Sequence, residues 1–94
     1  MQIVGRKVLH ELAAKHADVR NAVNAWLCEA EEAEWKKPTE VKSMYPHASI
    51  LSGNRMVFNL KGNRYRIEVK ISFRTGVVLI KRAGTHAEYS RWDT

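Results

Sequence analysis

The stretch that decides the fold is Arg64–Arg74, which reads RYRIEVKISFR. Apolar side chains occupy every second position of it, and polar side chains occupy the positions between them. The apolar set is Tyr65, Ile67, Val69, Ile71 and Phe73, and the polar set is Arg64, Arg66, Glu68, Lys70, Ser72 and Arg74. A period of two predicts a β-strand with one buried face and one wet, basic face. The turn formers Thr75 and Gly76 then send the chain back into a strand over 77–83.

Further strands are predicted on the N-terminal side of this stretch. Residues 48–52 and 55–60 are strand-like, and turn-forming residues separate them. Residues 61–63, Lys-Gly-Asn, predict a tight turn into the Arg64–Arg74 strand, because Gly and Asn tolerate the backbone angles that such turns require. Residues 1–4 are a candidate for a short additional strand.

Helical periodicity fills the first third of the chain. Residues 5–16 predict one helix, since their apolar side chains gather on one side. Asp18 is the predicted N-cap of a second helix, and Pro38 is expected to stop it. The second helix carries an apolar stripe at Val19, Ala22, Val23, Trp26, Ala30 and Ala33. Residues 39–46 predict a short turn of helix and a loop, and residues 84–94 a short helical or irregular end.

These elements predict an α+β fold. Two N-terminal helices pack on the apolar face of a mainly antiparallel β-sheet, which makes a two-layer sandwich. The length of 94 residues suits a single domain over 1–94 with one modest core. The other face of the sheet, with its arginines, is left open to a ligand or partner.

Positive charge is concentrated in the C-terminal part. The formal net charge is +6; residues 1–35 hold four Lys/Arg against six Asp/Glu, and residues 36–94 hold twelve against four. A polyanion is drawn to such a surface, because lysine and arginine release the counterions condensed on phosphates. The charge indicates a nucleic-acid or acidic-protein partner and does not choose between them.

The sequence also predicts a cytoplasmic protein without a membrane partner. A single cysteine, Cys28, cannot form an internal disulfide, and we expect it on the surface of the second helix. The N-terminus lacks a secretory signal, and charged residues break every apolar stretch.

Several kinds of catalysis are poorly supported. The four histidines, His10, His16, His47 and His86, form no ligand pair at helical spacing, so no metal or other cofactor is expected. Glu68 and Glu88 are the only carboxylates between residues 41 and 92, and Glu68 is better explained as a charge-balancing partner for Arg64, Arg66 and Lys70. The glycine loop that cradles phosphates and the serine nucleophile motif are both missing.

The chemistry that remains uses arginine, lysine, histidine and tyrosine. In metal-free RNA cleavage the 2′-hydroxyl of the substrate is the nucleophile, so the protein only orients the backbone, stabilises charge and moves two protons. The turn at Thr75–Gly76 is expected to bring Arg66, Lys81, His86 and Tyr89 together. Simpler alternatives remain open: the arginines also fit an ordinary solvated sheet face, His86 a cap of the final segment, and Tyr89, with Trp92 at helical spacing, a packing residue.

Three blocks resemble the HigB toxin family. They are Trp35-Lys36-Lys37-Pro38, the run Val57–Ile67 (VFNLKGNRYRI) and Gly84–Tyr89 (GTHAEY), and the likeness spans nearly the whole chain. The resemblance implies a RelE-like fold and a toxin of a type II toxin–antitoxin system that cleaves mRNA, commonly on the translating 70S ribosome. It also implies neutralisation by a HigA-like antitoxin with a helix-turn-helix domain, with operator DNA bound only through the toxin–antitoxin complex.

The same resemblance assigns site residues. Asn59, Lys61, Asn63 and Arg66 match the family's strand-turn-strand block, and His86 with Tyr89 match its Thr-His-x-x-Tyr ending. Three positions differ from the family: Lys81 replaces a usual arginine, Arg82 a usual apolar residue, and Ser90 a usual aspartate.

The leading hypothesis is therefore a metal-independent endoribonuclease. Arg66 and Lys81 hold the scissile phosphate, while His86 and Tyr89 share proton transfer. The expected RNA-guiding residues are Asn59, Lys61, Asn63, Arg64 and Arg74. The alternative is a catalytically inactive module that binds RNA or protein through the basic sheet face. Direct DNA binding is disfavoured, because no predicted recognition helix carries the positive charge.

Overall fold

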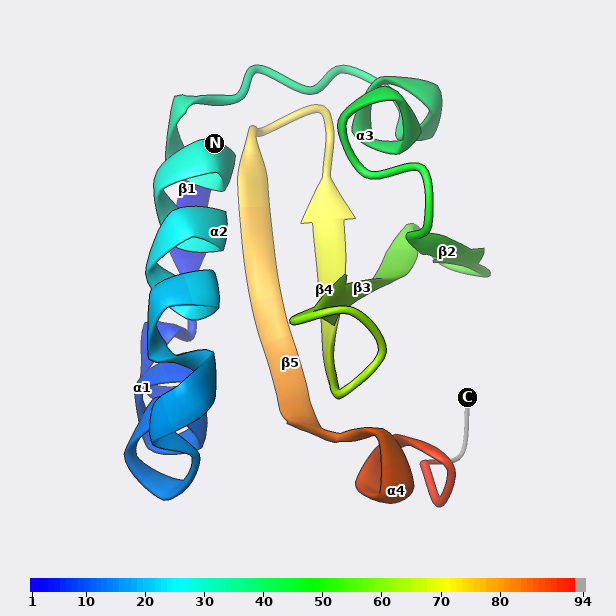
Figure 1. Cartoon of the computed structure of the whole chain (residues 1–94). Helices are drawn as coiled ribbons and strands as arrows, with labels where there is room; N and C mark the ends of the chain where they lie inside the picture. Colours follow the sequence, from blue (N-terminus) through cyan, green and yellow to red (C-terminus); the bar gives the residue numbers. More distant parts are fainter. Residues whose placement is uncertain (93–94) are drawn as a thin grey trace.

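A computed structural model describes residues 1–92 of the chain (Figure 1). The strands are β1 (Gln2–Val4), β2 (Ser49–Leu51), β3 (Arg55–Leu60), β4 (Tyr65–Ser72) and β5 (Val77–Thr85). The helices are α1 (Arg6–Lys15), the 3-10 turn η1 (Ala17–Val19), α2 (Arg20–Glu32), α3 (Pro38–Met44) and α4 (His86–Tyr89). In the described part of the chain, no helix has the length and apolar character needed to cross a membrane.

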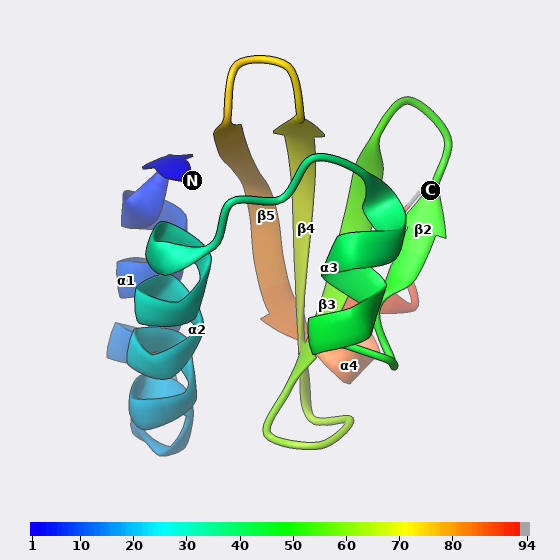
Figure 2. The ribbon, with the colours of Figure 1, turned by 90° about the horizontal axis from the view of Figure 1, so that it is seen from above.

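The strands form one sheet in the order β1-β5-β4-β3-β2. Strand β1 runs parallel to β5, and the other neighbours are antiparallel. The mainly antiparallel sheet predicted from the alternating pattern is therefore confirmed, and residues 1–4 contribute a strand as expected. Because the parallel strand comes from the N-terminus, it places α1 beside β5 (Figures 1 and 2).

Three helices share one core with one face of the sheet. Helix α2 contributes Trp26, whose ring meets the Phe58 ring of β3 edge-on at 5.2 Å between centroids. Val41 of α3 and Leu9 of α1 are fully buried in the same cluster. The apolar positions of β4 face this cluster, as their alternation predicts. The two-layer α+β sandwich is confirmed.

Two predictions about helix ends are wrong. Asp18 does not cap α2, because Val19 occupies the N-cap position and no side-chain cap bond forms there. Pro38 does not stop α2, which ends at Glu32; it begins α3 instead. Proline is well suited to a first helical turn, where its missing N–H would have no partner within the helix.

The prediction of a wet, basic face on β4 is also wrong at its centre. Arg66 is 8% exposed and Glu68 2% exposed, although both point away from the apolar cluster. Lys70 and Ser72, further along the same face, are exposed as predicted. The alternation identified the faces correctly, but it gave no sign that the C-terminal segment covers part of the polar one.

Candidate functional site

The site is built on the register between β4 and β5. Arg66 lies opposite Gly84, and Glu68 lies opposite Arg82. One pair further on, Val69 lies opposite Ile80, so Lys81 is the extra residue of a β-bulge. A bulge shifts the alternation of a strand by one position, and here it places Arg82 on the same face as Glu68.

Glu68 is the centre of a partly buried ion-pair network. Its Oε1 accepts a hydrogen bond from Nε of Arg82 at 2.7 Å, and its Oε2 lies 3.5 Å from Nη1 of Arg55. Burial of a carboxylate is costly unless it is paired, and these two guanidinium groups provide the pairing. Glu68 was expected to balance neighbouring cations. The charge-balancing role is confirmed, but the partners within residues 1–92 are Arg82 and Arg55 on the neighbouring strands, whereas Arg64, Arg66 and Lys70 were expected.

The C-terminal segment is held against this face by a capped helical turn. Oγ1 of Thr85 accepts a hydrogen bond from the backbone N–H of Glu88, and the Glu88 carboxylate accepts one from the N–H of Thr85. These bonds form a capping box. The N–H of Thr85 is the main reason that the pKa of Glu88 lies below its ordinary value of 4.5. Gly84 allows the close approach, since a Cβ there would lie 3.1 Å from the Glu88 carboxylate.

This segment brings Tyr89 and Arg66 together. The Arg66 guanidinium carbon lies 5.2 Å from the centroid of the Tyr89 ring, within the range of a cation–π contact. The His86 ring centroid lies 6.4 Å from that of Tyr89. A second pair of the same kind lies alongside, with Arg82 positioned 4.7 Å from the Trp92 ring. The sequence placed Arg66, His86 and Tyr89 near one another, and the structure brings them together in this way.

Arg66 is also tied to the β3–β4 turn. Its Nη1 donates to the backbone carbonyl of Asn63 at 3.0 Å and to that of Tyr65 at 3.4 Å. Asn59 faces Arg66 in the β3–β4 register, and its amide donates to the Asn63 side chain at 3.4 Å. Asn63 is therefore hydrogen-bonded both to Asn59 and to Arg66.

Two of the expected RNA-guiding cations contact the helical layer. Nζ of Lys61 donates to the backbone carbonyl of Asp18, and Nη1 of Arg64 lies 3.4 Å from the Asp18 carboxylate. The same carboxylate accepts a 2.6 Å hydrogen bond from the Tyr65 hydroxyl. This bond is the main cause of the lowered pKa of Asp18 and the raised pKa of Tyr65. Both cations remain exposed.

The structure places Lys81 and Arg74 apart from Arg66. Lys81 is exposed at the bulge and lines a hollow between β5 and α1, together with Glu11 and Lys15. Arg74 lies exposed in the turn between β4 and β5, beyond the last residue of β4. The sequence did not disclose the bulge, so it gave no reason to separate Lys81 from Arg66.

The contribution of Arg55, Arg82 and Trp92 was not predicted. Opposite charges on facing strands were the available signal for Arg82 and Glu68, but their pairing depends on the bulge. The contact of Trp92 depends on the path of the chain after α4. Within residues 1–92, no group of three His, Cys, Asp or Glu side chains is placed to hold a metal ion.

Comparison with known proteins identifies the family. The family model of the HigB toxin, described as the RelE-like toxic component of a toxin–antitoxin system, matches residues 19–92. The chain is 25% identical over 91 residues to mRNA interferase toxin HigB of Escherichia coli (strain K12) and to mRNA interferase HigB of Shigella flexneri. Each alignment covers 95% of this chain and 88% of the relative. Since the family model matches well over half of its length, the chain belongs to the HigB toxin family of RelE-like toxic components of toxin–antitoxin systems.

Proposed function

We propose that this toxin cleaves mRNA, as the relatives named mRNA interferase do, and that it needs no metal ion for the reaction. The 2′-oxygen of the RNA attacks the adjacent phosphorus, and the bond from phosphorus to the 5′-oxygen breaks. One proton leaves the 2′-hydroxyl and one reaches the departing 5′-oxygen. The products are a 2′,3′-cyclic phosphate and a 5′-hydroxyl, so the protein supplies only charge stabilisation, orientation and proton transfer.

The observation that carries this proposal is the contact between Arg66 and the Tyr89 ring beside His86. A guanidinium group suits the non-bridging oxygens of a phosphate because its planar fork donates two parallel hydrogen bonds. Nη1 of Arg66 donates to backbone carbonyls, and Nε and Nη2 make no hydrogen bond within residues 1–92. His86 and Tyr89 then supply the two groups that exchange protons.

The Tyr89 ring limits the access of a phosphate to Arg66. The side chain retains only a small exposed fraction, with the Tyr89 ring over its guanidinium group. A phosphate therefore reaches Arg66 when the Tyr89 ring moves aside, and the proposed proton transfer requires the tyrosine hydroxyl to stay beside that phosphate. Lys81 lies on the α1 side of the bulge, so we assign it to the cations that attract the RNA backbone, with Lys61, Arg64 and Arg74.

The proposed setting is the translating 70S ribosome in the cytoplasm, where mRNA is presented as a single strand. The proposed protein partner is a HigA-like antitoxin with a helix-turn-helix domain, and operator DNA is reached through the complex of the two. Family membership supports an antitoxin partner. The net charge of +6, concentrated after residue 35, supports attraction to RNA.

Controlled expression in bacteria tests the proposal. The wild-type chain is expected to arrest growth and to cut mRNA, whereas a variant carrying both Arg66→Ala and Tyr89→Phe is expected to do neither. Both proteins must reach similar levels and melt at similar temperatures. If the wild type and the double variant cut mRNA alike, the assignment of Arg66 and Tyr89 to the site is wrong. If the wild type binds ribosomes or RNA but cuts nothing, the chain is a binding module.

A further inference from the structure

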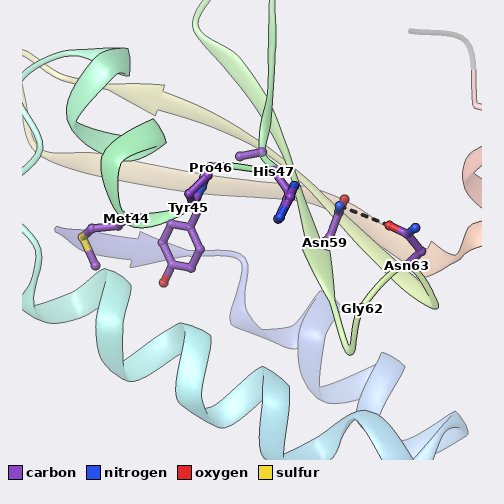
Figure 3. A pocket seen from close by; sticks show the side chains of 8 residues that line it. Met44, Tyr45, Pro46, His47, Asn59, Gly62 and Asn63 are labelled. Carbon is purple, nitrogen blue, oxygen red and sulfur yellow. Dashed lines mark hydrogen bonds between the residues drawn. The ribbon is translucent and has the colours of Figure 1, made fainter.

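A pocket lies at the end of β3 that β2 does not cover (Figure 3). It has a volume of about 460 Å³, which falls within the usual range of small-molecule sites. Its walls are the loop between α3 and β2 and the hairpin between β3 and β4. The loop contributes Met44, Tyr45, Pro46, His47 and Ala48, and the hairpin contributes Asn59, Gly62 and Asn63.

The loop wall is held in place by its own neighbours. Nζ of Lys42 donates at 2.7 Å to the carbonyls of both Pro46 and Ala48, which lie on either side of His47. The N–H of Ala48 donates to the carbonyl of Tyr45 at 3.0 Å. Tyr45 is anchored in turn, with its ring 5.1 Å from that of Phe58 and its hydroxyl bonded to Glu29. The exposed His47 side chain is therefore carried by a fixed backbone.

The hairpin wall presents two amide side chains. Asn59 comes from the end of β3 and Asn63 from the turn, and one amide hydrogen bond joins them. The turn uses left-handed backbone angles at Lys61 (φ 51°) and Gly62 (φ 67°), which direct the chain back toward β4. Nη1 of Arg66 donates to the carbonyl of Asn63, so the pocket wall is in direct contact with the proposed phosphate-binding group.

We propose that this pocket binds the base of a nucleotide next to the phosphate held by Arg66, and that His47 and Asn63 determine which base is accepted. The inference rests on the proposed function. Each primary amide carries both donors and acceptors, which matches the mixed edge of a nucleobase. A histidine ring can stack on a base or bond to its edge. RNA recognition commonly uses unstacked bases in this way, whereas the phosphate contact itself carries no sequence information.

Cleavage mapping in a cell-free translation reaction tests the pocket. The transcripts form a library randomised around the codon at which the ribosome pauses, and the cut sites are read by sequencing. We expect the wild type to prefer one base at one position beside the cut by at least about five-fold, the lower end for a hydrogen-bonded base contact. His47→Ala and Asn63→Ala are expected to reduce that preference at the same position. Both residues are exposed, so their variants should fold.

The matched control is His10→Ala, which removes an exposed histidine from α1 in a different hollow. This control is expected to keep the wild-type preference. If the wild type and all variants cut mRNA with the same base profile, the base-binding role of the pocket would be overturned and the proposed function would stay intact. Loss of neutralisation by the antitoxin with an unchanged profile would assign the pocket to the protein partner instead. If the wild type cuts nothing, the proposed function fails, and the pocket proposal fails with it.

Discussion

Arg66 and Glu68 lie two positions apart on the same face of β4, and both are buried. Their charged groups have different kinds of partner. Glu68 is paired with two guanidinium groups. Arg66 has no carboxylate partner within residues 1–92; backbone carbonyls and the Tyr89 ring contact it instead. A buried cation without an anion has most to gain from an anionic ligand, since the ligand adds charge-assisted hydrogen bonds. This difference favours Arg66 as the phosphate-binding group and Glu68 as a structural one.

Tyr89→Phe separates the chemical role of the ring from its packing role. Phenylalanine keeps the ring over Arg66, so the melting temperature and the RNA affinity should stay close to those of the wild type. Loss of the hydroxyl should lower the cleavage rate by about 10²-fold or more, which is the usual contribution of a proton-transfer group. Single-turnover cleavage and RNA binding, measured on the same protein, check this. A rate within a few-fold of the wild type would remove Tyr89 from the proton-transfer role.

Glu68→Gln is expected to destabilise the fold. The neutral amide leaves Arg82 and Arg55 without their shared carboxylate, and both cations are only partly exposed. We expect a loss of about 2–3 kcal/mol in the free energy of unfolding, somewhat below that for breaking a fully buried pair. Urea denaturation measures it, and a double-mutant cycle with Arg82→Leu isolates the pairwise part. An unchanged midpoint would show that the network contributes no stability.

The short helix α4 holds His86 and Tyr89 at the candidate site. It has four residues, too few to be stable alone, and its stability comes from the capping box and from packing on the sheet. Gly84 gives the helix room to lie close to β5. The elements that carry the proposed catalytic side chains are thus strand β4 and a helical turn at the end of β5.

Thr85→Ala tests the dependence on α4. The change removes the hydroxyl that accepts from Glu88, and loss of such a cap costs about 1 kcal/mol. We expect Tyr89 to be held less firmly beside Arg66, so its hydroxyl is poorly positioned for proton transfer, and cleavage should fall by about ten-fold or more while the rest of the fold persists. Thr85→Ser keeps the cap and should keep the activity. Equal activity in the two variants would mean that the cap does not position the site.

The elements themselves were largely predictable, because the periodicity of apolar residues reports burial directly. The strict alternation after Arg64 identified β4 and its core face. The errors at Asp18 and Lys81 share a physical cause, because both concern groups whose partners are distant in sequence. Asp18 was expected to cap a helix, but it binds Tyr65 instead. Lys81 was expected beside Arg66, but a bulge displaced it.

The candidate site was partly predictable for the same reason. A hairpin brings Arg66 close to the residues after β5, and this much follows from the Thr75–Gly76 turn. The burial of Arg66 and the pocket at His47 depend on how the C-terminal segment and the α3–β2 loop cross the sheet. Neither path has a local sequence pattern.

For the whole molecule, Asp18 links the helical layer to the sheet. It lies in η1, between α1 and α2, and accepts hydrogen bonds from Tyr65 and Arg64 at the start of β4. The pKa of Asp18 is below its ordinary value of 3.8, so the carboxylate favours the folded state at all pH values above that. The pKa of Tyr65 is above its ordinary value of 10.0, so its contribution is complete below pH 10.

Asp18→Ala is therefore expected to change the pH dependence of stability at both ends. In the wild type, the Asp18 contribution should be lost as the pH falls below about 4 through the lowered pKa, and the Tyr65 contribution as the pH rises above about 10. The variant should be less stable at neutral pH, and its stability should vary less in these two ranges. Urea midpoints across the pH range check this, with exposed Glu34→Ala as the control. If the stability of Asp18→Ala varied with pH in parallel with that of the wild type, Asp18 would not link the helical layer to the sheet.

In the proposed reaction this toxin cuts RNA through the substrate's own 2′-hydroxyl, with Arg66 at the phosphate. The most direct test uses an mRNA cut by the wild type on the ribosome, and the same mRNA with a single 2′-deoxy sugar at the cut site. We predict a 2′,3′-cyclic phosphate and a 5′-hydroxyl at the cut, no cut at that site in the deoxy mRNA, and no cut of either mRNA by Arg66→Ala. Cleavage of the deoxy mRNA at the same bond, or a 3′-hydroxyl with a 5′-phosphate, would contradict the account.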